Sequence, residues 1–303
     1  MTQLSGNIDD FGMCTATLAG PLEARLRAVR EAGFSQVMLD ARDIVDHPQG
    51  LEAAVAAVRA SGLRVTGLQT LRDFEGLTGQ LHDYKVDMAK ALLEMAAALG
   101  APLLLASSSV SPHASDDPQV IARDLRKLAI LAVPLGIRVA YQALSWGRVV
   151  SQFTAAWDMV CRADVPNLGL AIDSLHALAA ETALDDLEFI DSRKIFLVQL
   201  ADFMWQEART VEERMATATR QRVFPGEGAH SVQVGDLVSR LAAIGYRGDY
   251  CLDVFNDDYR QMPLAMVADR ARRSAAWLGE EVLQRSVPLP NAMRLKGRGA
   301  IAG

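Results

Sequence analysis

The sequence predicts a (β/α)8 barrel, and three observations support this fold class. Short apolar runs alternate with helical stretches along the chain, and the number of such pairs closes at eight. With 303 residues and 50% hydrophobic content, the chain is long enough for one large core. No glycine-rich dinucleotide turn follows the first strand, which disfavours the runner-up, a doubly wound open sheet.

Glycines mark the ends of the predicted helices. In five places a helical stretch ends in a glycine and an apolar residue, after which a β-rich run follows. A left-handed residue at a helix C-terminus is most easily glycine, and the next apolar side chain packs back on the helix. The glycines are Gly33, Gly62, Gly100, Gly136 and Gly245.

The first half of the chain contains four predicted strands, at residues 10–15, 36–39, 64–70 and 102–106. Pro21 occupies a favoured first-turn position and opens the first helix. Further helices are expected at 51–60 and 81–99, the latter with apolar residues at helical spacing. Asp117 and Pro118 are a plausible cap and first position for the next helix.

The second half repeats the pattern, with strands at 138–142, 168–173, 194–199 and 249–253 and helices near 151–161, 177–188, 232–243 and 263–284. Residues 203–222 form an insertion that is longer than a typical connection, and the capping-box pattern from Thr210 to Glu213 predicts a short helix in it. We interpret this insertion as a lid, or alternatively as a surface excursion. The predicted organisation is a single barrel over 1–285 and a loose C-terminal tail over 286–303.

Four strands in a row carry an oxygen-bearing side chain near their end. These residues are Gln142, Asp173, Gln199 and Asp253. Catalytic groups of such barrels lie at the C-terminal strand ends, so the four side chains should meet there. Two carboxylates and two amides suit Mg or Mn better than a zinc-type site. Hydrogen bonding among the four side chains is the alternative.

Other candidates also follow predicted strands. His176 lies three residues after Asp173, and its near-neutral pKa suits proton transfer, although a lone histidine is often a packing residue. Arg72, Arg148 and Arg222 each follow a strand and could clamp a carboxylate, or could be exposed side chains.

Composition limits the partners. A net charge of −6 argues against nucleic acid, because phosphate binding needs clustered Lys and Arg. The sequence has no basic N-terminal region followed by an apolar one, and no apolar run long enough to span a bilayer. We therefore expect a cytoplasmic protein without membrane association. The three cysteines lack metal-ligand spacing and fit reduced thiols. A small-molecule substrate is therefore expected.

Seven motifs, in order along the chain, resemble those of bacterial 3-dehydroshikimate dehydratases, which are xylose-isomerase-like TIM barrels. The motifs are Arg72–Gly76, Ser108–Pro112, Ala143–Arg148, Asp173–His176, Gln199–Asp202, Phe224–Gly228 and Val254–Asp257. The resemblance runs from about residue 15 to 284.

The resemblance implies a divalent metal held by Glu, Asp, Gln and Glu at the ends of strands 5 to 8. Asp173 and Gln199 match, whereas Gln142 and Asp253 stand where the family has glutamate. Met38 replaces an acidic residue common in these barrels.

The implied reaction is a carbon–oxygen lyase reaction, the loss of water from 3-dehydroshikimate to give protocatechuate. The resemblance implies that His176 is the base or acid and that Arg72 or Arg222 holds the carboxylate. Glu227 and Arg148 are expected to support these arginines.

Two further hypotheses are a sugar or sugar-phosphate isomerase or epimerase, and a non-catalytic barrel that binds a small carboxylate. Epimerisation by two glutamates would lose one partner, because the amide of Gln142 cannot accept a proton at neutral pH. A DNA-repair endonuclease fits poorly, since those enzymes resemble multi-zinc proteins rich in histidine ligands and only His176 lies among the candidate ligands here.

Overall fold

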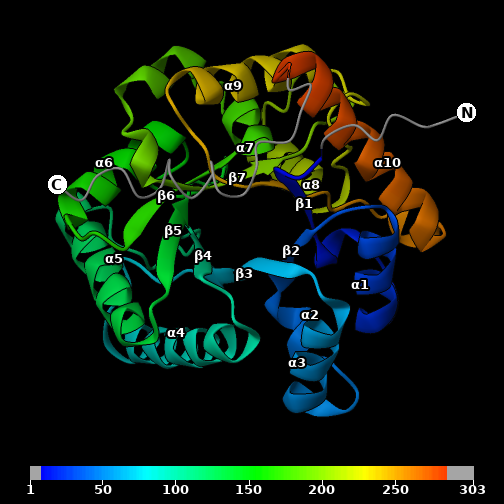
Figure 1. Cartoon of the computed structure of the whole chain (residues 1–303). Coiled ribbons are helices and arrows are strands. Elements are labelled where there is room, and N and C mark those ends of the chain that lie inside the picture. The colour runs from blue at the N-terminus through cyan, green and yellow to red at the C-terminus, as the bar shows by residue number, and fades with distance from the viewer. Residues whose placement is uncertain (1–7, 285–303) are drawn as a thin grey trace, which may run out of the picture.

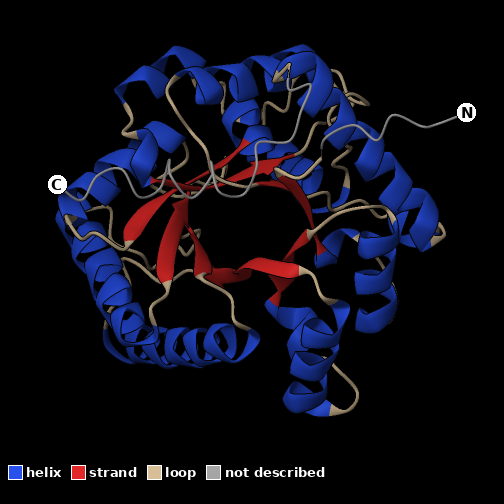
Figure 2. Ribbon diagram, in the orientation of Figure 1, coloured by secondary structure: helices blue, strands red, loops and turns tan. Residues whose placement is uncertain are grey.

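A computed structural model of the chain describes residues 8–284, which form a closed barrel of eight parallel strands in sequential order (Figures 1 and 2). The predicted fold class is confirmed. The strands are β1 Phe11–Cys14, β2 Gln36–Asp40, β3 Arg64–Arg72, β4 Leu103–Ser107, β5 Arg138–Gln142, β6 Leu168–Asp173, β7 Ile195–Leu200 and β8 Tyr250–Leu252. β1 pairs with β8 and closes the ring.

Helices surround the ring of strands (Figure 1). They are α1 Leu22–Glu31, α2 Ala41–Val45, α3 Gly50–Ser61, α4 Gly79–Leu99, α5 Pro118–Ala132, α6 Phe153–Ala163, α7 Ser174–Ala179, α8 Val211–Arg220, α9 Ser231–Ala243 and α10 Leu264–Trp277. The Asp117 cap of α5 is confirmed, since its carboxylate accepts the N–H of Gln119.

One predicted helix is wrong in extent. Residues 177–188 were expected to be helical throughout, but α7 ends at Ala179 and a separate 3-10 helix covers Leu184–Phe189. The backbone of Glu181 adopts a left-handed φ of 50°, which ends the helix. α7 also begins earlier than expected, because Asp173 caps the backbone N–H groups of Leu175 and His176.

All five glycines predicted at helix ends have positive φ, between 67° and 93°. Gly62 and Gly100 are the C-caps of α3 and α4, at φ 69° in both cases. The helix–glycine–strand pattern therefore corresponds to real backbone geometry, which β-carbon-bearing residues would adopt only with strain.

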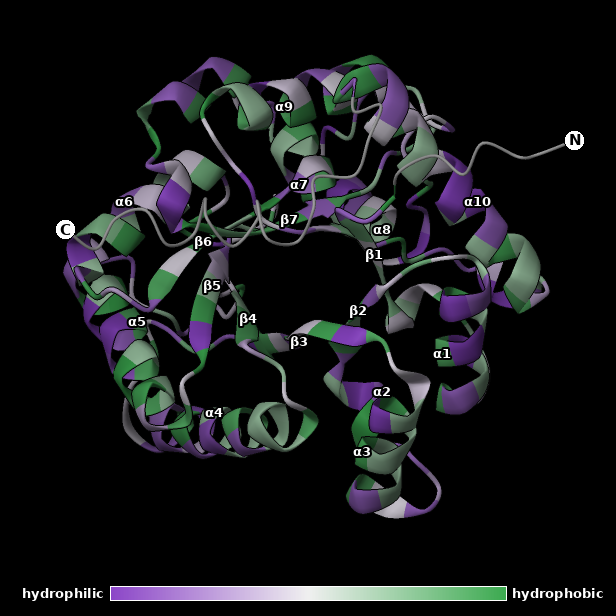
Figure 3. Ribbon diagram, in the orientation of Figure 1, coloured by the Kyte–Doolittle hydropathy of each residue, from purple (hydrophilic) through white to green (hydrophobic). Residues whose placement is uncertain are grey.

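Two apolar layers build the core. The larger lies between the strands and the helices, whose hydrophobic and hydrophilic residues alternate along each helix (Figure 3). The smaller fills the barrel interior and comprises Cys14, Met38, Leu103, Leu105, Ala140, Ala171, Leu197 and Cys251. This inner layer forms an apolar floor beneath the next inward-facing residues of each strand.

The insertion after β7 contains α8, as the capping box predicts. Thr210 accepts the N–H of Glu213, whose carboxylate accepts the N–H of Thr210 in return. Its role as a lid stays a prediction, and the predicted tail at 286–303 lies outside the described residues. Within residues 8–284, no helix is long and apolar enough to cross a bilayer.

Candidate active site

A polar layer lies directly above the apolar floor of the barrel. Side chains two residues apart on a strand point the same way, so Gln142, Asp173, Gln199 and Asp253 follow the floor residues of β5 to β8. All four are buried. Hydrogen bonds link Gln142, Gln199 and Asp253 through Gln69 of β3, and Arg222 bridges Asp173 to Asp253, so the predicted strand ends lie together.

The amides form a relay across the barrel. Gln142 Nε2 donates to Gln199 Oε1 at 2.6 Å, and Gln199 Nε2 donates to Gln69 Oε1 at 2.7 Å. Gln69 Nε2 then donates to Asp253 Oδ1 at 3.1 Å and to the Cys14 thiol at 3.1 Å. The relay is directional, running from an amide N–H on β5 to a carboxylate after β8.

Arg222 supplies a cation to this centre. Its Nη1 donates to Asp173 Oδ2 at 2.8 Å, to the Asp253 backbone oxygen at 3.1 Å and to Asp253 Oδ2 at 3.4 Å. Nε donates to the Ala218 backbone oxygen at 2.7 Å, and the guanidinium lies over the Phe255 ring. The alternative of an exposed Arg222 is wrong, since the residue is 3% exposed and hydrogen-bonded at both Nε and Nη1.

Burial raises the pKa of both carboxyl groups and the guanidinium of Arg222 lowers it, but the net shift differs between the two. Burial favours a raised pKa for Asp173, but the charge of Arg222, followed by that of His176, holds the pKa below its usual value. Burial raises the pKa of Asp253 to about 6 despite Arg222, because Asp173 lies close by and Arg222 is nearer to Asp173. Asp173 is therefore the firmly ionised partner.

His176 lies against both charged groups. Its Nδ1 contacts the Ser145 backbone N–H at 3.3 Å and the Ser145 hydroxyl at 3.2 Å. Its Nε2 is 3.3 Å from Arg222 Nη2 and 3.8 Å from Asp173 Oδ2. Burial lowers the pKa of His176 to about 4, with Asp173 opposing and Arg222 adding to the shift. A neutral imidazole at neutral pH can accept a proton.

The other predicted site residues do not contact this centre. The Arg72 side chain is exposed. Arg148 is also exposed, and its guanidinium donates to the Pro112 backbone oxygen. Glu227 turns toward α10, where it accepts hydrogen bonds from Arg270 at 3.0 Å and Tyr259 at 2.7 Å. Their roles at the site stay predictions.

Three buried polar residues were missed from the sequence. Gln69 ends an apolar run just as the four predicted residues do, so the same signal was present. Ser107 pairs in register with Gln142, and its buried hydroxyl has no protein partner among the described residues. The predicted fourth strand stopped one residue short of it.

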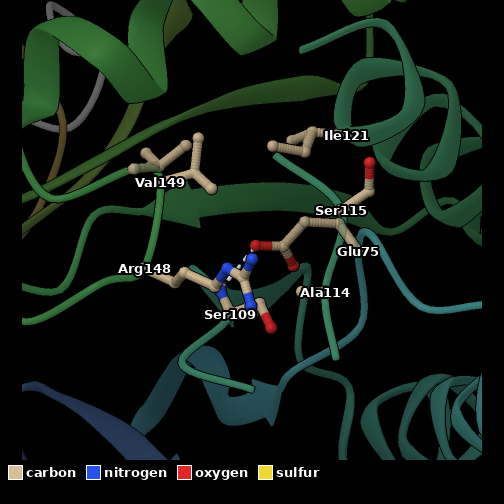
Figure 4. Close-up of a pocket in the computed structure, with 8 residues that line it drawn as sticks. Glu75, Ser109, Ala114, Ser115, Ile121, Arg148 and Val149 are labelled. Atoms are coloured by element: carbon tan, nitrogen blue, oxygen red, sulfur yellow. Dashed lines mark hydrogen bonds between the residues drawn. The ribbon is translucent and has the colours of Figure 1, made fainter. Parts of the chain in front are cut away.

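Glu75 is the third missed residue. It lines a small pocket formed by residues outside the β-strands, which Arg148 also lines (Figure 4). Its Oε1 accepts the N–H of Ser109 at 2.5 Å and the hydroxyl of Tyr141 at 2.9 Å. Its Oε2 is buried without a protein partner within residues 8–284. Only the fold brings these residues together, so no local pattern could have revealed the cluster.

The four expected metal ligands, as arranged, do not fit a divalent cation. Gln199 Oε1 is used by Gln142, and Asp173 Oδ1 caps α7. A metal shared by Asp173 and Asp253 would need the position that Arg222 Nη1 holds. Within the described part of the chain, no group of three or more His, Cys, Asp or Glu could hold a metal ion.

Three curated relatives are similar in sequence. A 3-dehydroshikimate dehydratase of Pseudomonas aeruginosa is 35% identical over 91% of this chain and 43% of its own length. One from Neurospora crassa is 27% identical over 81% of this chain and 84% of its own length. An inosose isomerase of Halalkalibacterium halodurans is 28% identical over 57% of this chain and 60% of its own length. The chain thus spans less than half of the Pseudomonas relative.

Solved structures agree on the fold. A xylose isomerase-like TIM barrel/4-hydroxyphenylpyruvate dioxygenase fusion protein aligns with TM-score 0.84 and 31% identity over 93% of this chain and 45% of its own. The IOLI protein, solved with a binding zinc atom, aligns with TM-score 0.78 and 20% identity over 90% of this chain and 98% of its own. A divalent metal therefore occurs in a protein of this fold.

A sequence model described as the xylose isomerase-like TIM barrel matches residues 26–281, which include seven of the eight strands. Together with the closed barrel and the polar centre at its strand ends, this match shows that the chain belongs to the xylose isomerase-like TIM barrel family.

Proposed function

We propose that the protein is a lyase that removes water from 3-dehydroshikimate and yields protocatechuate. The observation that carries this proposal is the buried cluster of Asp173, His176 and Arg222, in a chain similar to relatives named 3-dehydroshikimate dehydratase. The substrate is a small molecule with hydroxyls and a carboxylate.

His176 is the proposed base. In the dehydration, a C–H bond next to the ring ketone breaks and the proton moves to the imidazole. The neighbouring C–O bond then breaks, hydroxide takes up a proton and leaves as water, and tautomerisation of the ketone completes the aromatic ring. A neutral imidazole suits the first step, and its protonated form suits the second.

Arg222 is proposed to stabilise the ketone oxygen of the substrate, which gains negative charge as the enolate forms. Arg222 Nη2 lies 3.3 Å from His176 Nε2 and has no other protein hydrogen-bond partner within residues 8–284, so it can donate to a ligand oxygen. A fixed donor in a buried site stabilises a developing enolate without having to reorganise. The unpartnered hydroxyl of Ser107 is a further proposed ligand contact.

The carboxylate of the substrate needs a separate cation, since Arg222 is committed to Asp173. Arg148 and Arg72 are exposed after β5 and in β3, and one of them is the proposed clamp, with Glu227 as a more distant support. The Mg or Mn ion expected from the sequence remains a prediction, and the side-chain oxygens of Asp173, Gln199 and Asp253 are already hydrogen-bonded, which argues against it.

An isomerase is the second candidate, supported by the inosose isomerase relative. The amide of Gln142 disfavours it, because this residue cannot serve as a second base. A barrel that binds a small carboxylate without turnover is the third.

The test is incubation of the protein with 3-dehydroshikimate while protocatechuate absorbance is followed. We expect product, and His176→Gln should lower the rate about 100-fold or more while the fold is kept. His47→Gln is the matched control, since His47 is also buried but its imidazole pairs with Glu23 of α1. Absence of product from the wild type with every divalent metal tried would contradict the proposal, and ligand binding without turnover would favour the third candidate.

A further inference from the structure

The centre of the barrel already contains a bound positive charge. Arg222 Nη1 lies between the carboxylates of Asp173 and Asp253, at 2.8 Å and 3.4 Å from their Oδ2 atoms. This is the position that a cation shared by both carboxylates would take. Nε is tied to a backbone oxygen of α8, and the guanidinium face lies against Phe255, so the side chain is held in place.

The amide relay depends on glutamine at position 142. Gln142 must donate an N–H to Gln199 Oε1, which leaves the Gln199 amide free to donate to Gln69, and Gln69 in turn to Asp253. A glutamate at 142, which the dehydratase resemblance leads one to expect, has no such N–H. Its carboxylate would face the Gln199 oxygen, and the relay would have to reverse or break. The relay therefore fits a centre without a metal, since it uses the oxygen that a metal would bind.

Charge balance leads to the same result. The two carboxylates and the guanidinium together carry a formal charge of −1 in a site where each side chain is at most 4% exposed. A divalent ion bound while Arg222 stays in the site would change this to +1, whereas with glutamate at 142 the same ion would leave the site neutral. A buried excess charge is costly, so glutamine in place of glutamate at position 142 weakens the binding of a divalent ion. The shorter side chain of Asp253 also reaches less far into the centre.

We infer that the resident cation of this barrel is the guanidinium of Arg222, and that the centre does not take up a divalent metal. Asp173 and Asp253 are its counter-ions, and Gln142, Gln199 and Gln69 complete the hydrogen bonding around it. The inference concerns the same site as the proposed function but requires no particular substrate.

The test needs no activity assay. Wild-type protein is dialysed against EDTA and then titrated calorimetrically with MnCl2, MgCl2 and ZnCl2, and its melting temperature is measured with and without each metal. We expect no one-to-one binding and an unchanged melting temperature at about 1 mM metal, since a ligand bound only by the folded state would raise it. One-to-one binding with a Kd below about 0.1 mM would overturn the inference.

Two variants sharpen the result. The double variant Gln142→Glu/Asp253→Glu should gain saturable Mn binding and a melting temperature that rises with metal. A folded double variant that binds no metal would overturn the charge argument. Arg222→Met should melt at a lower temperature and be partly rescued by MnCl2, whereas rescue should be absent for Arg126→Met, whose guanidinium bonds a backbone oxygen on the barrel exterior.

The wild-type titration decides the matter even if the variants fail to fold. It is also independent of the proposed function. A protein that binds no metal and makes no protocatechuate would keep this inference and lose the dehydratase. A protein that binds Mn and makes protocatechuate would do the reverse.

Discussion

Replacing Glu75 with glutamine should remove a pH dependence of stability. The carboxyl group is 3% exposed, and it joins the loops after β3 and β4 to Tyr141 of β5. One oxygen accepts two hydrogen bonds, and the other has no protein partner among the described residues. Burial raises the pKa of Glu75 to about 6, against bonds from its own backbone, Ser109 and Tyr141 that lower it.

The sign follows from which state binds the proton more tightly. The folded protein holds the Glu75 proton up to about pH 6, whereas the ordinary pKa of a glutamate is 4.5. The stabilising effect of the neutral carboxyl is therefore complete below pH 4.5 and is lost as the pH rises through 6. A rise of the pKa from 4.5 to about 6 corresponds to about 2 kcal/mol in the free energy of unfolding.

The assay is urea denaturation of the wild type and Glu75→Gln at several pH values from 4 to 8. Glutamine is neutral throughout, so the variant should gain about 2 kcal/mol relative to the wild type as the pH rises across this window. Glu31→Gln, on the exposed face of α1, is the control and should show no such gain. A difference between Glu75→Gln and wild type that stays constant with pH would refute the reasoning.

Three further predictions concern the centre and the insertion. Arg222→Met leaves two buried carboxylates without their cation and should cost about 3–5 kcal/mol by urea denaturation, whereas a loss under 1 kcal/mol would contradict the buried pairing. Ser107→Ala removes a hydroxyl that has no protein partner in residues 8–284, so stability should change by less than about 1 kcal/mol while KM for 3-dehydroshikimate rises; an unchanged KM would remove Ser107 from the site. Thr210→Ala breaks the capping box and should destabilise α8 by about 1 kcal/mol, seen as faster amide exchange in α8 but not in α9, and equal exchange would be inconsistent with the cap.

Much of the fold could be predicted because its signals are local. The glycines after α3 and α4 mark backbone conformations that the flanking residues alone determine. The strand ends could be predicted because parallel strands that close into a ring bring their carboxyl ends together, so one hydrogen-bond relay joins Gln142 to Asp253 although 111 positions separate them. The early end of α7 could not, since nothing in the sequence showed that Glu181 adopts a left-handed conformation.

The site was harder to predict than the fold because its character depends on long-range pairing. Arginine is usually an exposed residue, and the burial of Arg222 is compensated by its hydrogen bond to Asp173, 49 positions away. Glu227 was expected near the arginines of the site, but Arg270 of α10 pairs with it instead. A sequence shows which residues reach the strand ends, whereas which cation neutralises which carboxylate is decided by the assembled barrel.

The central claim, a barrel whose chemistry depends on His176 and Arg222 rather than on a divalent metal, is tested most directly by one rate. Protein freed of metal by EDTA dialysis is mixed with 3-dehydroshikimate in EDTA-containing buffer, and protocatechuate is measured over time. The predicted result is product at the same rate as in untreated protein. Product that forms only after Mg or Mn is restored would contradict the claim.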